Sequence, residues 1–431
     1  MRKIIKVYLT LLILINTAAG QTLNDTLLFN LFNKVTDFAT QKVLANPKEY
    51  RYQIIYTQID RDKKGIPTFK NHYLNVDPTQ YFNPASMVKM PLAFLSLEKL
   101  REMKIAGIDK NTRMSFDSSY ERQVAMSRDS SSESGFPTIA HFIKRAFLIS
   151  ENDPYNRMYQ FLGQGEINSR LKSKGYSSAR ITRQFMGYTE EQNRHTNGIK
   201  FLNKKGEIIH QQEPGFNADS FHFPSPVLIG KAHMNRNDSL VQSPFDFTRH
   251  NNISLEDMQQ MLQAVVFPES VDQKKRFNIS NADRLFLLQY LSQYPSETNY
   301  PKYDEKIFHD SYVKFFFYDS THRMPDHIRV FNKVGWAYGF LTDVSYVIDT
   351  INNIDYMLSA TVYVNSDGIV NDSKYDEETI GFPFLRSIGH SFYQYDLSRE
   401  RKTKPQLQNP VKHYESRIKG DTRPSIKTAD N

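Results

Sequence analysis

The sequence has no cysteine and no apolar run long enough to cross a membrane. Without cysteine the chain forms no disulfide, no thiolate metal site and no cysteine nucleophile, and it carries no lipid anchor on that residue. Its most apolar run, Val7 to Ile15, is shorter than the roughly 20 residues that a spanning helix requires. We therefore expect no stable membrane insertion of the mature chain.

An excess of basic charge is absent from the central part of the chain. The formal net charge of +8 is confined to the two ends, because residues 1–20 carry +3 and residues 399–431 carry +5. The part between them is neutral, so the composition does not require a basic surface that binds nucleic acid. We expect no nucleic-acid partner.

The two ends also differ from the rest in their residue pattern. Residues 1–20 have a basic start, an apolar run and a small-residue end, Ala18-Ala19-Gly20. This pattern predicts a signal peptide and an exported protein, periplasmic or extracellular. Residues 398–431 are polar, basic and interrupted by three prolines, which predicts a disordered tail. Residues 21–397 remain for one folded domain.

The most informative stretch is a polar turn that leads into an apolar helix. Ser86 lies at the start of this helix and Lys89 follows three residues later, so both share one face of its first turn. Pro91 is tolerated only in a first turn, which places the helix start near Ser86. An uncharged lysine beside a serine hydroxyl is able to take its proton, which makes Ser86 a candidate nucleophile.

Ser-x-x-Lys by itself is a weak signal in this chain. At least four of its occurrences are accidental, because it begins at five positions: Ser86, Ser96, Ser169, Ser311 and Ser416. The alternative is that Ser86 is a plain helix cap and Lys89 a solvated side chain. Further polar residues close to Ser86 would favour the nucleophile over the helix cap.

Hydrophobic periodicity predicts an α+β fold. Strands near both chain ends with helices between them suit one antiparallel sheet, completed by the two ends, and a helical middle. From about residue 183 to 252 the pattern is irregular and interrupted by glycine and proline. The predicted helices, besides the one that starts near Ser86, are 27–43, 138–147, one starting at Asp153-Pro154 with Asp153 as its N-cap, 167–174, 254–265, 282–290 and 382–395. The predicted strands are 52–59, 69–76, 328–335, 344–349 and 357–364, and residues 199–210 are predicted to form a hairpin.

Two further polar elements accompany Ser86. Ser150-Glu151-Asn152 falls in a short loop between two predicted helices. Lys333-Val334-Gly335-Trp336 falls at the end of a predicted strand, and Tyr338-Gly339 then provides a turn into the next one. A lysine on an otherwise apolar strand needs a partner or an open cleft.

The order of these three elements resembles that of the penicillin-recognising serine hydrolases, namely class A β-lactamases and the related D-alanyl-D-alanine peptidases and transpeptidases. The elements of that family are Ser-x-x-Lys, Ser-Asp-Asn and Lys-Thr-Gly. The resemblance extends over roughly residues 27–397 and is close only around the motifs. It implies a β-lactamase/transpeptidase-like fold, with a five-stranded antiparallel sheet flanked by helices and joined to an all-helical region.

The resemblance implies a catalytic role for four residues. Ser86 would attack a carbonyl carbon, and Lys89 would activate Ser86 and pass its proton onward. Ser150 would relay a proton to the leaving nitrogen. Lys333 would supply positive charge for a substrate carboxylate.

It also implies a substrate-binding role for three residues. Asn152 would orient Lys89 and a substrate amide. Gly335 would let the substrate approach the strand closely. The backbone N–H of Trp336, together with that of Ser86, would hold the oxyanion.

The chain departs from the family pattern at several positions. Glu151 replaces the aspartate, and Val334 replaces a threonine or serine whose hydroxyl binds the substrate carboxylate. The family's deacylating glutamate, followed four residues later by an asparagine, has no counterpart with that spacing. Glu190 and Glu191 precede Asn193 at spacings of three and two, and the span 183–252 is long for the family.

We therefore expect an exported, β-lactamase-like serine hydrolase that forms an acyl-enzyme on Ser86 and hydrolyses a β-lactam or a related cyclic or linear amide. One alternative is a D-alanyl-D-alanine cell-wall peptidase or penicillin-binding protein that acts on peptidoglycan-derived material. Another is a non-catalytic envelope binding protein on the same scaffold. We expect no cofactor and no metal, because the spacing of four histidines in the irregular span matches no metal signature: His210, His222, His233 and His250.

Overall fold

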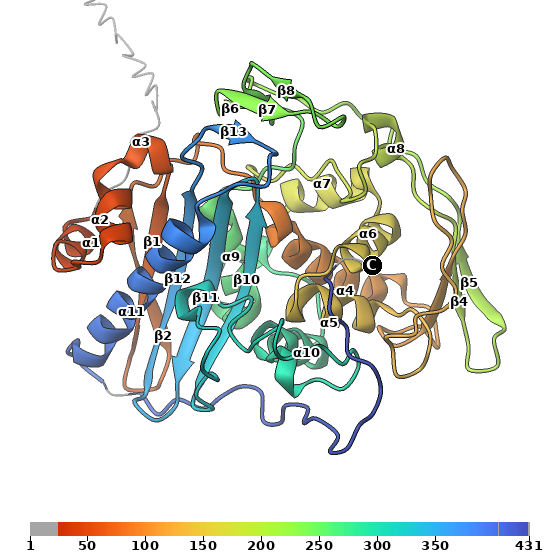
Figure 1. The fold of residues 1–431 in the computed structure, drawn as a ribbon. Coiled ribbons are helices and arrows are strands. Elements are labelled where there is room, and N and C mark those ends of the chain that lie inside the picture. The colour runs from red at the N-terminus through yellow and green to blue at the C-terminus, as the bar shows by residue number, and fades with distance from the viewer. Residues whose placement is uncertain (1–24, 404, 430–431) are drawn as a thin grey trace, which may run out of the picture.

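The computed structural model describes residues 25–403 and 405–429. An antiparallel sheet stands at the centre, with a small group of helices on one face and a larger helical region on the other (Figure 1). The predicted α+β architecture, with a five-stranded sheet and a helical region, is confirmed. The predicted signal peptide, residues 1–20, lies outside the described residues.

The central sheet joins strands from the two ends of the chain. Its order is β10-β11-β12-β1-β2, and β1 pairs with β12 in the middle, where Ile55 lies opposite Ser359. Every residue of β11 and β12 is buried, because helices cover both faces of these inner strands. The bounds are β1 Gln53–Arg61, β2 Pro67–Leu74, β10 Ile328–Ala337, β11 Phe340–Asp349 and β12 Ile354–Tyr363.

The turn between β10 and β11 forms as predicted. Tyr338 and Gly339 have φ of 56° and 78°, the left-handed pair that a two-residue hairpin turn requires. The strand after it starts at Phe340, earlier than the predicted residue 344. Polar Thr342 and Asp343 caused this error, since both are buried and hydrogen-bonded within the sheet region instead of lying in a loop.

The outer face of the sheet is covered by helices from both chain ends. α11 packs on β12 and α2, and the Phe32 and Phe392 rings meet edge to face at 5.5 Å. The prediction of a single helix over 27–43 is wrong, because Asp37 accepts a hydrogen bond from the Thr40 backbone N–H and starts a new helix. The helices are α1 Thr26–Phe32, α2 Phe38–Ala45, α3 Pro47–Tyr50 and α11 Phe382–Ser398, preceded by the π-helical turn η6 Glu377–Gly381.

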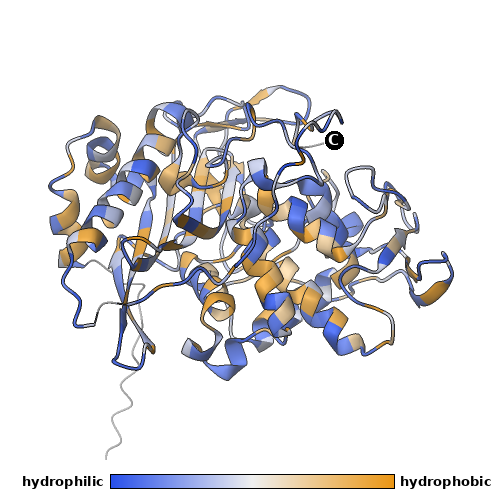
Figure 2. Ribbon diagram, turned by 90° about the horizontal axis from the view of Figure 1, so that it is seen from below, coloured by the Kyte–Doolittle hydropathy of each residue, from blue (hydrophilic) through white to orange (hydrophobic). Residues whose placement is uncertain are grey.

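The inner face packs against the helical region, where most of the hydrophobic core lies. α9 covers β11 and β12, while α4 packs against α5 and α6. Figure 2 shows hydrophobic segments on the central strands and helices and mostly hydrophilic outer loops. The bounds are α4 Lys89–Met103, α5 Ile139–Leu148, α6 Asn152–Leu162, α7 Gln164–Ser173, α9 Leu255–Val266 and α10 Asn281–Ser292, with short 3-10 turns η1 Ala85–Val88, η2 Pro268–Ser270, η3 Gln273–Lys275, η4 Pro295–Glu297 and η5 Phe315–Phe317.

The irregular span 183–252 contains short elements that extend the molecule on two sides. The predicted hairpin-like region after Ile199 forms β4 and β5, which project from the helical region with β3, and β7 pairs with β13 beyond one end of the central sheet (Figure 1). The bounds are α8 Glu190–Arg194, β3 Arg113–Phe116, β4 Ile199–Leu202, β5 Ile208–Gln212, β6 Leu228–Ile229, β7 Ala232–Met234, β8 Leu240–Val241, β9 Phe245–Asp246 and β13 Ile369–Val370.

The C-terminal segment does not extend away from the body, so the prediction of a disordered tail is wrong for residues 405–429. We call these residues the C-terminal strap. They run along the underside of the molecule to the helical region (Figure 1). Val411 is buried, and Glu415 accepts hydrogen bonds from Lys144 and Tyr290, each at 2.7 Å. Helices that are distant in the sequence supply the hydrogen-bond partners of Glu415. The composition of the segment alone does not reveal such partners.

In the described part of the chain, no helix combines the length and apolar character that a membrane span needs.

Candidate active site

Ser86 and Lys89 lie where the 3-10 turn η1 continues into α4. Lys89 is the first residue of α4 and Pro91 the third, as the tolerance of proline in a first turn predicts. The Lys89 Nζ donates a hydrogen bond of 2.7 Å to the Ser86 hydroxyl. Lys89 is fully buried while Ser86 is half-buried and lines a cavity. The serine is therefore accessible and its lysine is not.

The loop between α5 and α6 brings Ser150 and Asn152 to Lys89. The Lys89 Nζ donates to the carbonyl and the hydroxyl of Ser150, the latter at 3.3 Å, and to the Asn152 Oδ1 at 2.8 Å. α6 begins at Asn152, so the predicted N-cap role of Asp153 is wrong. Asp153 instead accepts from Arg157 one turn later. Asn152 thus lies on the first turn of a helix that faces the buried lysine.

Lys333 reaches the same place from the central sheet. Its Nζ donates to the Ser150 Oγ at 2.8 Å and to the Val334 carbonyl at 2.8 Å. Burial, reinforced by the nearby Lys89 charge, holds the pKa of Lys333 well below the usual value for lysine. The Ser150 hydroxyl therefore lies between two buried amines, one from α4 and one from β10.

Glu151 occupies the position of the family's aspartate without entering the cleft. Its carboxylate accepts from the Arg145 Nε at 2.8 Å and from the Tyr303 hydroxyl at 2.6 Å. Burial raises the pKa of this carboxyl group, with the Arg145 charge opposing the shift. The longer side chain is accommodated because it points back toward α5 and the Tyr303 loop.

Gly335 lies where β10 crosses η1. A Cβ atom at this position would lie 2.4 Å from the Pro84 carbonyl oxygen and 3.0 Å from Met87, so glycine is needed for the close approach. The next residue, Trp336, lines the cavity, and its indole N–H donates to Glu377 at 2.8 Å. The chain segments that carry the Ser86 and Trp336 backbone N–H groups are therefore adjacent.

A cavity of about 960 Å³ opens over Ser86. Part of its wall comes from the irregular span, which supplies Arg183, Phe185, Arg236 and His250. Among the described residues that line it there is no aspartate and no glutamate. Phe185 faces Lys89, with the ammonium nitrogen 5.4 Å from the ring centroid. No sequence pattern pointed to these four residues, because none lies within a recognisable motif.

Glu190 and Glu191 do not line the cavity. Glu190 is exposed and pairs with Arg249 at 2.6 Å. Glu191 pairs with His195, one turn along α8, at 3.3 Å. Both carboxylates therefore belong to surface ion pairs, and neither faces Ser86.

The chain is similar to several solved structures. Solved structures that match the chain include a class A beta-lactamase from Mycobacterium abscessus, with 13% identity over 83% of this chain and 98% of that one and a TM-score of 0.43. A beta lactamase from Burkholderia vietnamiensis has 9% identity over 85% and 99%, with a TM-score of 0.47. A beta-lactamase from Desulfarculus baarsii has 12% identity over 82% and 97%, with a TM-score of 0.44.

No curated protein matches the chain. The sequence model of the Beta-lactamase enzyme family, in contrast, matches residues 39–394. This range includes η1, the loop before α6 and the whole central sheet. The chain therefore belongs to the Beta-lactamase enzyme family.

Proposed function

We propose that the protein is an exported serine hydrolase that forms an acyl-enzyme on Ser86 with a β-lactam or a related amide. The single observation that carries the proposal is one hydrogen-bond network: Lys89 contacts the accessible Ser86, Ser150 and Asn152, and Lys333 contacts Ser150. Export rests on the residue pattern of positions 1–20 alone.

In the proposed reaction the Ser86 oxygen forms a bond to the substrate carbonyl carbon. Its proton passes to the uncharged Lys89 amine. The Ser150 hydroxyl gives its own proton to the leaving nitrogen as the C–N bond breaks, and Lys89 returns the proton to Ser150. The backbone N–H groups of Ser86 and Trp336 stabilise the oxyanion. Two adjacent buried amines do not both hold a proton easily, and the lowered pKa of Lys333 is consistent with one uncharged amine beside the Ser150 hydroxyl.

The charges of the cavity favour a substrate with a carboxylate. Arg183 and Arg236 line it, and no described carboxylate opposes them. His250 adds no charge near neutral pH, since burial lowers its pKa to about 3. Val334 offers no hydroxyl at the strand edge, so we propose that the arginines take over part of the recognition of the carboxylate.

Hydrolysis of the acyl-enzyme is proposed to be the slow step. A water that attacks the ester needs a general base within hydrogen-bond reach. The described wall supplies an aromatic ring near Lys89 instead of a carboxylate. We therefore expect acylation to be faster than deacylation, with slow net turnover.

The test is to incubate the purified protein with a fluorescent penicillin and a chromogenic cephalosporin. We expect a covalent label on Ser86, located by peptide mass spectrometry, and slow cephalosporin hydrolysis. Ser86→Ala should abolish both. Ser96→Ala is the matched control, because Ser96 belongs to another Ser-x-x-Lys sequence but is fully buried in α4. Labelling that persists in Ser86→Ala, or no labelling of the wild type, would refute the proposal.

A further inference from the structure

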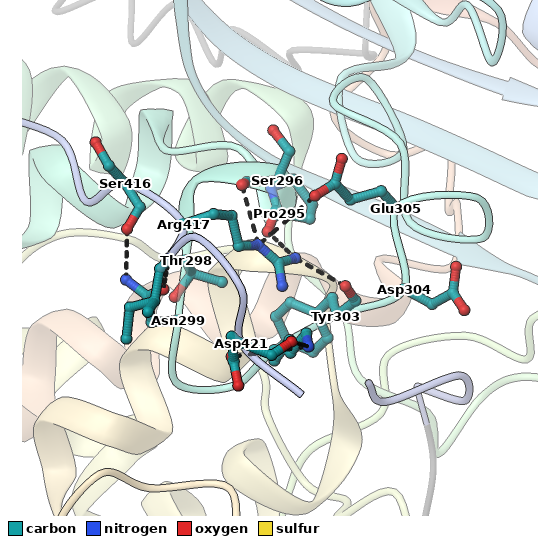
Figure 3. Close-up of polar contacts among 12 residues, drawn as sticks. Pro295, Ser296, Thr298, Asn299, Tyr303, Asp304, Glu305, Ser416, Arg417 and Asp421 are labelled. Carbon is teal, nitrogen blue, oxygen red and sulfur yellow. Dashed lines mark hydrogen bonds and ion pairs between the residues drawn. The ribbon is translucent and has the colours of Figure 1, made fainter. Parts of the chain in front are cut away.

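The C-terminal strap is anchored on the loop that connects α10 to the sheet. The Arg417 guanidinium donates to the carbonyl oxygens of Pro295, Ser296 and Tyr303 at 3.2, 3.1 and 2.7 Å (Figure 3). Three backbone acceptors on one guanidinium fix the path of the loop, because the planar fork offers its donors in set directions. The anchor thus holds both ends of a segment that runs from 295 to 303.

Two more contacts tie the strap to the same loop. The Asn299 side chain donates to the Ser416 carbonyl at 2.6 Å (Figure 3). It also accepts from the Ile418 backbone N–H at 2.7 Å. Further on, Ile426 pairs with the backbone on both sides of Tyr303, donating to the Lys302 carbonyl at 2.8 Å and accepting from the Asp304 N–H at 2.9 Å. The strap therefore holds the main chain around Tyr303 by a short parallel pairing.

Tyr303 connects the loop that the strap holds to the candidate active site. Its side chain is fully buried, and its hydroxyl donates to the Glu151 carboxylate at 2.6 Å. The other partner of Glu151 is Arg145 on α5. Glu151 is consequently fixed from two sides, by a helix and by the loop that the strap holds.

Ser150, the residue before Glu151, requires such support. Its φ is 69°, a left-handed conformation that a residue with a side chain rarely adopts. In this conformation its carbonyl accepts from Lys89 and its hydroxyl contacts both Lys89 and Lys333. Relaxation of the backbone at Ser150 would move these two oxygens away from the two amines.

We propose that the C-terminal strap positions the catalytic loop, acting through Tyr303 and Glu151 on Ser150. Tyr303, Glu151 and Arg417 are positioning residues in this scheme and do not touch the substrate. The inference rests on the proposed function for its kinetic consequence, but the restraint on the loop exists in the unliganded protein and is measurable there.

The main test uses Tyr303→Phe and Arg417→Ala in the full chain. Phenylalanine keeps the buried ring and removes only the hydroxyl. We expect the rate constant of Ser86 acylation at saturating fluorescent penicillin to fall about 10- to 100-fold. The apparent dissociation constant of the non-covalent complex that precedes acylation should change less than about two-fold. Arg417→Lys should restore part of the rate, because an ammonium still reaches some of the carbonyls.

A double variant tests the route. If Arg417 acts through the Tyr303 hydroxyl, Arg417→Ala combined with Tyr303→Phe should be no slower than the slower single variant. Multiplied losses would show that the strap acts by another route and would overturn the inference.

Two control variants separate positioning from general stability. Lys419→Ala removes a cation from the same strap at an exposed position and should acylate like the wild type. Phe32→Leu weakens the remote core, where its ring packs on Phe392, and should lower the melting temperature without changing the acylation rate constant.

Hydrogen exchange of the peptide containing residues 149–153 provides a readout that does not depend on activity. Exchange in unliganded Tyr303→Phe and Arg417→Ala should exceed that of the wild type and of both controls. Unchanged exchange and unchanged acylation in these variants would overturn the inference. If the wild type is not labelled at all, the proposed function fails, and the exchange experiment still decides whether the strap holds the loop.

Discussion

We propose that Phe185 influences the lifetime of the proposed acyl-enzyme. Its ring lies near the Lys89 ammonium, and no described carboxylate lines the cavity around Ser86. An apolar ring neither removes a proton from water nor orients it, so under the proposed function it would not assist hydrolysis of the ester. The proposed acylation step therefore has its groups in place, whereas the described cavity wall offers no base for deacylation.

A carboxylate at position 185 should accelerate deacylation. We expect Phe185→Glu to shorten the lifetime of the fluorescent label at least about 10-fold, since general base catalysis contributes factors of about 100 or more when the geometry is favourable. Phe185→Gln is the matched control, with the same shape and no basic group. Decay of the label in gel fluorescence measures the lifetime. Equal lifetimes for the two variants would contradict this role of Phe185.

At the scale of the elements, β10 lies against η1 where we propose the oxyanion site. Gly335 makes the approach possible, because the atom nearest to an added Cβ is the backbone oxygen of Pro84. A backbone oxygen cannot turn aside as the end of a flexible side chain can. Any side chain at 335 must therefore separate the strand from the turn that carries Ser86.

Gly335→Ala should accordingly lower the acylation rate constant more strongly than it lowers the free energy of unfolding. We expect an acylation rate constant about 100-fold lower, because a shift of roughly 1 Å between the Trp336 and Ser86 N–H groups misplaces the oxyanion donors. Stopped-flow labelling measures the rate. Gly198→Ala is the control, as a Cβ there meets only ordinary contacts at 3.5 Å. If both variants acylate at the same rate, the close approach is not needed.

At the scale of the whole molecule, the environment of His250 predicts a stability that depends on pH. Burial lowers the pKa of His250 to about 3, with Arg183 adding to the shift and Asp246 opposing it. In the unfolded chain a histidine titrates near 6.5. Between these values the unfolded state binds a proton that the folded state does not, so the free energy of unfolding decreases as the pH falls through this window.

His250→Gln should flatten this dependence. Between about pH 6 and pH 4 the slope of the unfolding free energy against pH should decrease by about one proton, because the variant has no histidine to protonate on unfolding. Urea denaturation at a series of pH values gives the slope. The same exchange at the exposed His413 is the control, and a wild-type slope in His250→Gln would disprove the assignment.

The sequence by itself determined those features that depend on neighbours along the chain. Ser86 and Lys89 are three residues apart on one helical turn, and the Tyr338-Gly339 turn joins two strands, so short-range geometry was enough to predict both. The loop of Ser150 and Asn152 between two helices followed from the same kind of local signal. Hydrophobic periodicity predicted the α+β class, and the family resemblance of the ordered motifs implied the β-lactamase/transpeptidase-like fold.

Only the tertiary structure decided which distant residues meet. Ser150 and Lys333 are 183 positions apart and share a hydrogen bond, and Phe185 faces Lys89 from a span with no regular pattern. The strap shows the same limit, because the acceptors of Arg417 are backbone carbonyls on a remote loop. Composition predicts whether a segment can bury apolar surface, but a polar segment is also ordered when another part of the chain supplies its hydrogen-bond partners.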